Sequence, residues 1–348
     1  MTLYKPCIKA VGPANAKIAI VGEAPGETEE QLGVPLVGAS GNLLDGILRQ
    51  ADLTRAECYL TNVLWTRPPN NKLEAFCVEK ADIHALRSLP SLSKGLYLHS
   101  DFACELQRLR DELIKLKPNL IVACGNTAAW ALLRQTAISK IRGTIVQSDF
   151  GKVLPTYHPA AIFRQWDLRP VVVADFIKAK NESAFPEVKR PAREIIINPS
   201  FGDIAGYYEL ARRARAIACD IETQNGQITC IGFAINPKQA LVIPFVDHRK
   251  PDKHYWQDPA DEVEAMRWTA KFLELPQPKI FQNGLYDLQY LRKYRFRVVN
   301  CLHDTMLLHH ALHPELLKGL GFMGSVYTNE PAWKLMRQRG EEVLKRDE

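Results

Sequence analysis

Four short apolar runs in the first half of the chain are each followed by a turn-forming or polar residue: AKIAIVG, CYLTNVLW, NLIVACG and KVLPTYHP. Stretches of helical periodicity lie between them, around residues 42–50, 101–116 and 126–134. Strands that alternate with helices predict a parallel sheet with helices on both of its faces. Ligands of such sheets bind at the carboxyl ends of the strands, so the four strand ends should converge on one site.

The second half has a different order of elements. An amphipathic helix over residues 202–216 precedes three apolar runs, IACDIET, QITCIGFAI and ALVIPFV, and then come the helix DEVEAMRWTAKFLEL, the strand PKIFQN and the helix LYDLQYLRKY. The pattern predicts an α/β fold with a mixed sheet. Between the halves, residues 186–195 carry prolines and mixed charge without periodicity, which is typical of a linker. We therefore expect domains at 1–185 and 196–348.

Composition narrows the class of protein. A length of 348 residues suits two domains, and no apolar run is long enough for a membrane span. The net charge of +6 is mild, so it permits a nucleic-acid partner without demanding one. The eight cysteines are scattered without a C-x-x-C pair, as expected of reduced thiols. We expect a cytoplasmic protein, in the host cytoplasm if the gene belongs to a phage, with no membrane partner.

Carboxylates recur at metal-ligand spacing in the second half. Asp220 and Glu222 alternate on one strand and so point to the same face, while Asn283 ends a strand and Asp287 follows one helical turn later. Hard oxygen ligands in this arrangement suit Mg²⁺ or Mn²⁺. Two such ions could stabilise the attacking and leaving oxygens of a phosphodiester.

On these residues, the second half resembles the DEDD-type 3′→5′ exonuclease domain of family A DNA polymerases. DIE is similar to its first motif, NGLYD to its second, and the segment from HDT onward to phage polymerases of this family. The resemblance implies a ribonuclease H-like mixed-sheet fold, Asp220, Glu222 and Asp287 as metal ligands, and Asn283 as a substrate contact. It implies no catalytic role for Asp304.

The third exonuclease motif, a Tyr and an Asp four residues apart, is not found before the last printed residue. A site that lacks one carboxylate should hold its second metal poorly, so exonuclease activity stays open. The polymerase module is expected on another chain or in a segment missing from this one.

The stretch VGEAPGETEEQLGVPLVGASG follows the first strand and combines glycine turns with glutamates. A phosphate-binding loop is disfavoured, because G-K-[ST] is absent and the glutamates would repel phosphate. A metal site lacks further ligands at suitable spacing. Cleavage of an N-glycosidic bond fits better: an acid faces the sugar, an amide reads the base, and a histidine donates to the departing base anion.

With YLTNVLWTRPPNN and PTYHPAAIFR, this stretch resembles the three motifs of the uracil-DNA glycosylase superfamily, most of all its iron–sulfur group, family 4, and the glycosylase-like domain of some phage polymerases. The resemblance implies a three-layer α/β/α fold and three groups of site residues: catalytic Glu23, Glu29 and His158; uracil-binding Gly22, Pro25, Leu36 and Asn62; and DNA-binding Ile162, Phe163 and Arg164. Glu23 would activate water with support from Glu29, and His158 would stabilise the uracil anion at O2. Ile162 or Phe163 would act as a wedge in the minor groove, and Arg164 would lie near phosphate.

Two features depart from the family pattern, the residue at position 36 and the set of cluster ligands. At Leu36 the family usually has a Phe, whose stacking on the base is worth roughly 1–3 kcal/mol. The family holds its cluster with four cysteines, of which Cys7 and Cys104 occupy plausible positions, whereas Ala10 and Thr66 replace the other two. Cys77 lies near these positions in the sequence and could in principle supply a further ligand. We expect no iron–sulfur cluster, and no cofactor for the glycosylase.

The sequence therefore predicts a phage-type replication or repair protein that excises uracil from DNA and carries an exonuclease-like domain. The alternative is a non-catalytic uracil- or template-binding module of a DNA polymerase. A third possibility is a nuclease whose glycosylase half is only structural, if a separate chain supplies the missing carboxylate.

Overall fold

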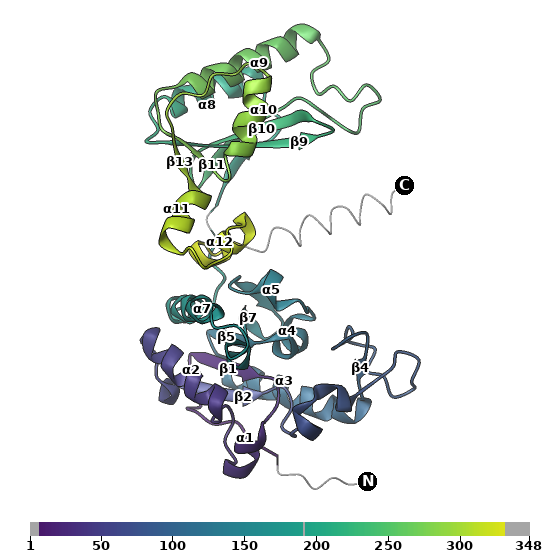
Figure 1. The fold of residues 1–348 in the computed structure, drawn as a ribbon. Helices are drawn as coiled ribbons and strands as arrows, with labels where there is room; N and C mark the ends of the chain where they lie inside the picture. Colours follow the sequence, from purple (N-terminus) through teal and green to yellow (C-terminus); the bar gives the residue numbers. More distant parts are fainter. Residues whose placement is uncertain (1–6, 191, 331–348) are drawn as a thin grey trace. The chain divides into compact units, whose positions relative to one another are not determined.

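The computed structural model describes residues 7–190 and 192–330, which form two compact units. Residues 7–190 together with 321–330 make the first unit, and residues 192–320 make the second (Figure 1). The division falls inside the predicted linker at 186–195. Residues 321–330, which the sequence analysis assigned to the second domain, group with the first unit because side chains of that unit bind helix α12 (Leu320–Tyr327).

The first unit is built on a five-stranded sheet in the order β2–β1–β5–β7–β6. Strands β1 (Ile18–Gly22), β2 (Cys58–Asn62), β5 (Leu120–Cys124) and β7 (Gly151–Thr156) are parallel, as predicted. Strand β6 (Val146–Ser148) pairs antiparallel with β7 at the edge, because a short turn connects these two strands. The predicted fold class of this unit is confirmed, with one antiparallel edge strand added.

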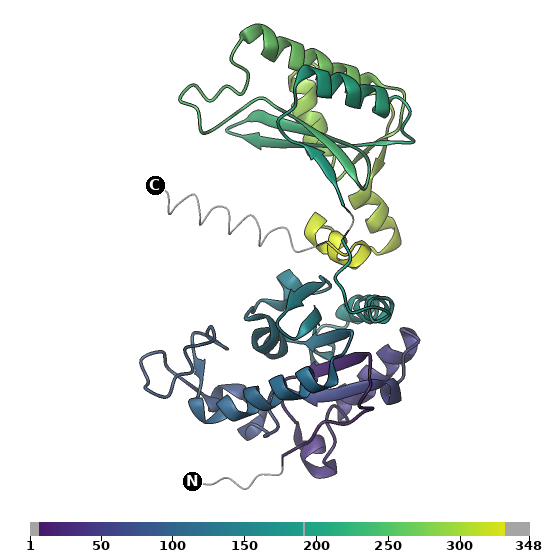
Figure 2. The same cartoon turned by 180° about the vertical axis from the view of Figure 1, so that it is seen from behind.

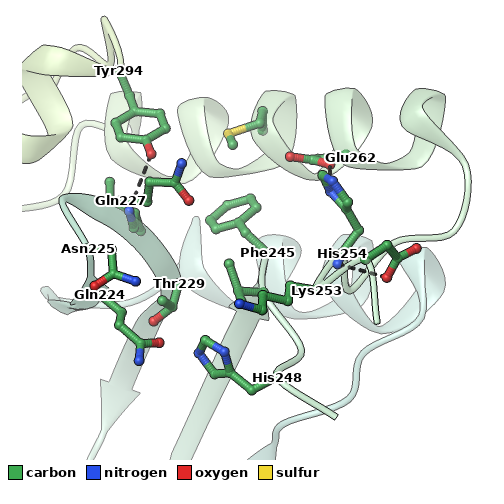
Figure 3. Close-up of a pocket in the computed structure, with 14 residues that line it drawn as sticks. Gln224, Asn225, Gln227, Thr229, Phe245, His248, Lys253, His254, Glu262 and Tyr294 are labelled. Carbon is green, nitrogen blue, oxygen red and sulfur yellow. Dashed lines mark hydrogen bonds and ion pairs between the residues drawn. The ribbon is translucent and has the colours of Figure 1, made fainter. Parts of the chain in front are cut away.

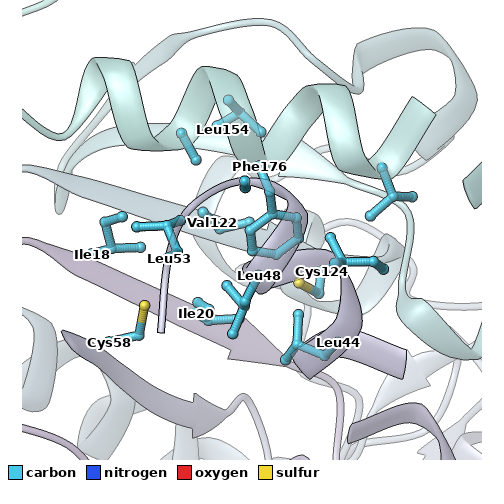
Figure 4. Close-up of a cluster of buried hydrophobic side chains, with 14 of the residues drawn as sticks. Ile18, Ile20, Leu44, Leu48, Leu53, Cys58, Val122, Cys124, Leu154 and Phe176 are labelled. Atoms are coloured by element: carbon cyan, nitrogen blue, oxygen red, sulfur yellow. The ribbon is translucent and has the colours of Figure 1, made fainter. Parts of the chain in front are cut away.

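Alternating residues of β1 enter two separate cores. Ile18 and Ile20 pack with helices α2 (Ala39–Gln50) and α7 (Leu168–Glu182), whereas Ala19 and Val21 pack with α3 (Ala103–Leu116) and α4 (Asn126–Leu133). Figure 4 shows the first core, where Leu44 and Leu48 of α2 and Phe176 of α7 lie around Ile20. Apolar side chains on both faces of a strand are typical of a covered parallel sheet. The unit is therefore a three-layer α/β/α sandwich.

Short elements connect these layers. They are helices α1 (Glu27–Leu32), α5 (Ile138–Ile141) and α6 (Pro159–Ile162), the hairpin of β3 (Cys77–Val78) and β4 (Tyr97–Leu98), and single 3₁₀ turns at Arg55–Glu57, Pro69–Asn71, Leu73–Phe76 and Ser100–Phe102.

The second unit contains a six-stranded mixed sheet in the order β13–β12–β9–β10–β11–β8. Its strands are β8 (Glu194–Ile196), β9 (Ile217–Gln224), β10 (Gln227–Asn236), β11 (Gln239–Pro244), β12 (Lys279–Phe281) and β13 (Cys301–Asp304). Strands β9, β10 and β11 are antiparallel neighbours, while β12 runs parallel to β9 and to β13. This mixture confirms the prediction for the second half.

Helices α8 (Phe201–Ala211) and α9 (Pro259–Glu274) cover one face of this sheet (Figure 2). Phe272 of α9 stacks on Phe233 of β10 with ring centroids 4.6 Å apart. Helices α10 (Leu285–Lys293) and α11 (Thr305–Leu312) follow β12 and β13. None of the helices in the described part of the chain combines the length and apolarity that a membrane span requires.

A buried ion pair fastens α12 to the sheet of the first unit. Arg142 forms a two-pronged contact with Asp175 of α7, and its Nη1 donates to Ser325 Oγ of α12 at 2.8 Å. Thr156 Oγ1 also donates to Asp175 Oδ2 at 2.6 Å. The side chains of Arg142 and Asp175 are each 1% exposed, so each charge depends on its partner for stabilisation.

Replacing Asp175 by Ala should therefore lower the free energy of unfolding by roughly 3–5 kcal/mol, because it leaves the buried guanidinium without a counter-charge. Ser325→Ala should cost about 1 kcal/mol, the value of one hydrogen bond. Denaturant unfolding followed by circular dichroism measures both, with the exposed Asp149→Asn as the control. An Asp175→Ala protein as stable as wild type would contradict this account.

Candidate functional site

Glu23 follows β1 directly and is held from two sides. Its backbone oxygen accepts a hydrogen bond from Leu64 N at 3.0 Å. Its carboxylate oxygen Oε2 accepts one from the buried hydroxyl of Thr127, in the first turn of α4. The carboxylate is therefore fixed at the carboxyl end of the sheet. Nothing in the sequence singled out Thr127, because its partner lies 104 residues away.

The contacts of Glu29 are all with backbone groups. Its Oε1 accepts hydrogen bonds from Val37 N at 3.1 Å and Gly38 N at 2.9 Å, and its Oε2 accepts one from Gly26 N at 3.1 Å. The side chain is buried. These bonds join the two turns of the glycine-rich stretch, so Glu29 supports the site by shaping this loop and does not compete with Glu23 for a water molecule.

The Asn62 amide lies directly against Gly22. The two residues are partners in the pairing of β1 and β2, and a Cβ atom added to Gly22 would lie 2.3 Å from Asn62 Oδ1. The same Cβ would lie 3.1 Å from Leu36 Cδ2. Only glycine leaves room for the amide here, so the predicted uracil-binding residues Gly22, Leu36 and Asn62 do come together.

Leu36 adopts a backbone conformation that is rare for its type, with φ at 55°. Its carbonyl oxygen accepts a hydrogen bond from Arg55 Nη2 at 2.7 Å. A Cβ on Gly41 would lie only 2.0 Å from this oxygen, so a glycine is required there as well. The strained turn directs the Leu36 side chain towards Gly22.

The Asn62 side chain is 2% exposed, and neither Oδ1 nor Nδ2 has a hydrogen-bond partner among the described residues. A buried amide without partners costs on the order of 1–3 kcal/mol for each unsatisfied group, so native proteins rarely keep one without a reason. A ligand edge that offers one donor and one acceptor side by side would satisfy both atoms.

His158 lies two residues after the end of β7 and caps α6. Its Nδ1 accepts a hydrogen bond from Ala160 N at 3.2 Å, which leaves Nε2 to carry the proton of the neutral ring. Burial of the imidazole lowers the pKa of His158 to about 4, and the nearby Glu29 opposes this only in part. His158 is therefore a neutral hydrogen-bond donor at pH 7.

These groups surround a cavity of about 570 Å³. Of the residues predicted for the site, its lining includes Glu23, Pro25, Glu29, Leu36, His158 and Arg164, and it adds Ser40, Asn126, Ile138 and Tyr157. Asn62 and Gly22 do not line the cavity themselves but lie next to Leu36, which does. The predicted convergence of strand ends is thus present for Glu23 and His158, while the Asn62 amide lies outside the lining, close to Gly22.

Carboxylates also gather in the second unit. Asp220 and Glu222 lie on the exposed face of β9, and Asp287, in the first turn of α10, accepts a hydrogen bond from Ile221 N at 3.0 Å. Loss of hydration, together with the negative charges of Asp287 and Glu222, raises the pKa of Asp220 to about 6. Burial likewise raises the pKa of Asp287. The three predicted metal ligands are therefore close enough to repel one another.

Asp304 and Asn283 shape the neighbouring turn. Asp304 accepts hydrogen bonds from the backbone N–H groups of Asn283 and Gly284 at 3.2 and 2.7 Å, and it caps α11. Asn283 has φ at 57° and is exposed. The sequence analysis expected no catalytic role for Asp304, and these contacts are structural.

Within the described ranges, no three His, Cys, Asp or Glu side chains come together in a set able to hold a metal ion. One oxygen of Asp287 is already engaged with the β9 backbone. The arrangement of Asp220, Glu222 and Asp287 therefore does not fit a bound Mg²⁺ or Mn²⁺, and we derive no metal-dependent step from it.

A second cavity, of about 400 Å³, lies at the hairpin between β9 and β10 (Figure 3). Amide side chains from the hairpin, Gln224, Asn225 and Gln227, face the loop that carries His248 and Lys253. On β9, Gln224 alternates in step with Asp220 and Glu222. Asp220, Glu222 and the cavity-lining Gln224 therefore lie in succession on one face of β9.

Comparison with known proteins decides the family of the first unit. The sequence model of the Uracil DNA glycosylase superfamily matches residues 9–181. The type-4 uracil-DNA glycosylase of Archaeoglobus fulgidus is 34% identical over 181 residues, which cover 49% of this chain and 79% of that protein. The chain belongs to the uracil-DNA glycosylase superfamily. The predicted enzyme class is confirmed at the level of the family.

A second relative spans both units. The DNA polymerase of Bacillus phage SP01 is 24% identical over 338 residues, which cover 87% of this chain and 33% of that polymerase. The solved structure of Escherichia coli RNase D, described as an exoribonuclease, matches 40% of this chain and 34% of its own, with a TM-score of 0.27 and 17% identity. At that score the likeness to RNase D carries no argument. The predicted resemblance to a phage polymerase is confirmed by the polymerase match.

The loop predicted to bind DNA in the first unit needs one correction. Ile162, one of the two candidates for a wedge, is fully buried in the core with α2 and α7, so it cannot enter DNA. Phe163 is 57% exposed and Arg164 lines the cavity. Trp166, which the sequence analysis missed, is 65% exposed on the same loop. An apolar residue inside a short helix gave no signal of which side would be buried.

The like charges in the second unit lead to a stability prediction. Asp220 binds its proton more tightly in the folded state, with a pKa of about 6, than in the unfolded state, where the ordinary value is 3.8. Stability should therefore fall as pH rises from about 4 to 6. Asp220→Asn should remove this fall and raise the free energy of unfolding at pH 7.5 by about 1 kcal/mol, allowing for solvent screening at this exposed site.

Thermal unfolding of both proteins at pH 4 and pH 7.5 measures the difference. The control is Glu274→Gln at the exposed end of α9, which should show the same pH dependence as wild type. An Asp220→Asn protein that is less stable than wild type at pH 7.5 would mean that the carboxylates do not repel one another.

Proposed function

We propose that the first unit hydrolyses the N-glycosidic bond of uracil in DNA. The observation that carries the proposal is the buried Asn62 amide, which has no partner in the described residues and lies beside the cavity that holds Glu23 and His158. The Watson–Crick edge of uracil offers an N–H next to a carbonyl oxygen. Those groups would satisfy Oδ1 and Nδ2 of Asn62 together, and reading of this edge is the step that requires the base to leave the stack.

Glu23 acts on the sugar side of the reaction. Its carboxylate accepts a proton from the attacking water while the new bond from the water oxygen to C1′ forms and the bond from C1′ to the base nitrogen breaks. Its negative charge also stabilises the cationic, oxocarbenium-like sugar. Thr127 keeps the carboxylate in place for both tasks.

His158 acts on the base side. The bonding electrons leave with uracil as an anion, whose O2 accepts a hydrogen bond from the neutral Nε2–H. The hydrogen bond from Ala160 to Nδ1 determines this tautomer. A donor that is already oriented before the reaction stabilises developing charge without reorganising, which is the main advantage of such sites.

The loop after α6 would hold the DNA. Arg164 lines the cavity and would contact a phosphate next to the flipped uracil, and the exposed Phe163 would fill the space that the base leaves. Pro25 in the lining gives the pocket a rigid wall. Leu36 would contact the uracil ring without the stacking that an aromatic side chain supplies.

For the second unit we propose an exonuclease-like DNA-binding role in association with a DNA polymerase. The match to the SP01 polymerase supports this context. Mg²⁺ or Mn²⁺ binding by Asp220, Glu222 and Asp287 would require rearrangement of the carboxylates. Asn283 is an exposed candidate for contact with the 3′ end. A protein that binds uracil in DNA without excising it is the alternative to the glycosylase.

The direct test uses an end-labelled oligonucleotide with one internal uracil, incubated with the protein in EDTA and then cleaved with alkali. We expect a cut at the uracil. Glu23→Gln should slow excision by roughly 10²–10⁴-fold, because it removes the proton acceptor. His158→Ala should slow it by roughly 10²–10³-fold, because it removes the donor to the anion.

Matched controls are Glu27→Gln in α1 and His84→Ala in the first unit, which are not among the cavity-lining residues and should excise uracil at the wild-type rate. Uracil-selective binding without any cut would favour the binding module. A ladder from the 3′ end that appears only with Mg²⁺ would show that the carboxylates of the second unit rearrange to work.

The pH profile provides an independent check on His158. Because its pKa is about 4, the imidazole stays neutral throughout pH 5–8 and the excision step should not slow through His158 protonation in that range. The depressed pKa also means that His158 contributes stability above pH 6.5 that is lost as pH falls towards 4. Single-turnover excision rates from pH 5 to 8 measure the first effect. Two observations together would contradict a neutral donor. They are a wild-type excision rate that falls by half near pH 6.5 and the absence of this fall in His158→Gln.

A further inference from the structure

Residues 62–66 connect β2, which ends at Asn62, to the loop over the cavity, and Glu105 of α3 holds this segment at its far end. One carboxylate oxygen accepts a hydrogen bond from Trp65 N, and the other accepts one from Thr66 Oγ1 at 2.9 Å. Charge-assisted bonds of this kind are about twice as strong as neutral ones. Both oxygens of the Glu105 carboxylate therefore bind this segment.

Arg108, one helical turn later, holds the near end. Its Nη2 donates to the carbonyl oxygens of Asn62 at 2.9 Å and Val63 at 2.8 Å. Its Nη1 donates to Thr61 Oγ1 at 3.2 Å and to Glu112 Oε2 at 3.0 Å. The guanidinium carbon also lies 4.4 Å from the centre of the Trp65 ring. A rigid planar fork can make these contacts at once, whereas a lysine cannot.

The network is largely removed from water. The side chains of Arg108 and Glu112 are each 16% exposed. Burial lowers the pKa of Arg108, and the negative charges of Glu112 and Glu105 act in the opposite direction, so the guanidinium remains charged. A charged fork in such surroundings holds its carbonyl partners firmly, because water cannot replace it.

The iron–sulfur group of the family would place cluster ligands around this same segment. Of the four positions, Thr66 carries a hydroxyl that is bound to Glu105, and the near neighbour of Cys7 is Ala10. Cys104 is exposed and its Sγ donates to Asp101 O at 3.4 Å. Cys77 donates to Leu73 O. Thiols occupy only two of the four positions, and even with Cys77 the set falls short of the four thiolates that hold a four-iron cluster.

We propose that Glu105, Arg108 and Glu112 form a polar clasp that fastens residues 62–66 to α3 in place of an iron–sulfur cluster, and that Arg108 thereby positions Asn62. The role of the clasp in holding the segment stands on the contacts alone, whereas its effect on uracil reading rests on the proposed function. Arg108 and Glu105 are positioning residues, since they act through the backbone of the segment and through Thr66.

The first test does not depend on activity. The full chain, purified without oxygen from iron-supplemented cells, should contain less than about one iron atom for every ten chains and show no visible absorbance from a cluster. Hydrogen exchange at the Trp65 amide should be slow in wild type and at least about ten-fold faster in Glu105→Ala. Glu105→Gln, which keeps an acceptor oxygen, should restore part of the protection. Asp111→Ala, exposed on the same helix, is the control and should leave the exchange unchanged.

The second test asks whether Arg108 acts through Asn62. Arg108→Ala should lower kcat/KM for uracil excision roughly 10–100-fold, as loss of a supporting contact commonly does. In an Asn62→Ala background the same change should cost less than about 3-fold, since coupled residues are not additive. Arg110→Ala, exposed on the same helix, should leave kcat/KM at the wild-type value.

The outcomes separate this proposal from the proposed function. About four iron atoms per chain with visible absorbance, or unchanged Trp65 exchange in Glu105→Ala, would overturn the clasp whatever the activity. Additive effects of Arg108→Ala and Asn62→Ala would overturn the positioning role. If the wild-type protein excises no uracil, the proposed function fails, but the iron content and the exchange rates still test the clasp. The comparison of Arg108→Ala with and without Asn62→Ala then uses binding of a uracil oligonucleotide in place of kcat/KM.

Discussion

The close approach of β1 and β2 is the constraint on which the glycosylase site depends. Gly22 and Asn62 are paired partners at the carboxyl ends of these parallel strands, and a side chain on Gly22 would displace the Asn62 amide. The amide consequently lies in a buried position without satisfied hydrogen bonds, an arrangement that a packed core does not favour by itself.

The remaining groups of the site are fixed by bonds to the scaffold around them. Glu29 closes the glycine-rich turns, Thr127 holds Glu23, and the Ala160 amide determines the tautomer of His158. The bonds to Glu23 and His158 fix these two side chains beside the cavity, whereas those of Glu29 hold the loop. Such preorganisation is what lets fixed dipoles stabilise charge that appears only during the reaction. The polar clasp on α3 extends the same principle to the backbone of Asn62.

The carboxylates have opposite electrostatic surroundings in the two units. In the glycosylase unit the acids accept hydrogen bonds from backbone or hydroxyl groups, and Asp175 is paired with Arg142. In the second unit, Asp220 and Asp287 lie close together with raised pKa values. Repulsion of this kind is relieved by a cation or by protonation. The same residue type therefore has a structural or reactive role in one unit and stores electrostatic strain in the other.

Apolar periodicity and turn residues in the sequence determined the strands, the principal helices and the residues at strand ends, because these depend on local spacing. The order of the motifs was sufficient to predict that Glu23, Asn62 and His158 lie at the carboxyl edge of the sheet. Only the tertiary structure decided which side of a short helix is buried, so that Ile162 lies in the core and Phe163 does not. It also decided that Thr127 binds the Glu23 carboxylate, that Arg108 binds the Asn62 carbonyl, and that residues 321–330 pack on the first unit. Those contacts join residues far apart in the chain, and local spacing carries no information about such pairs.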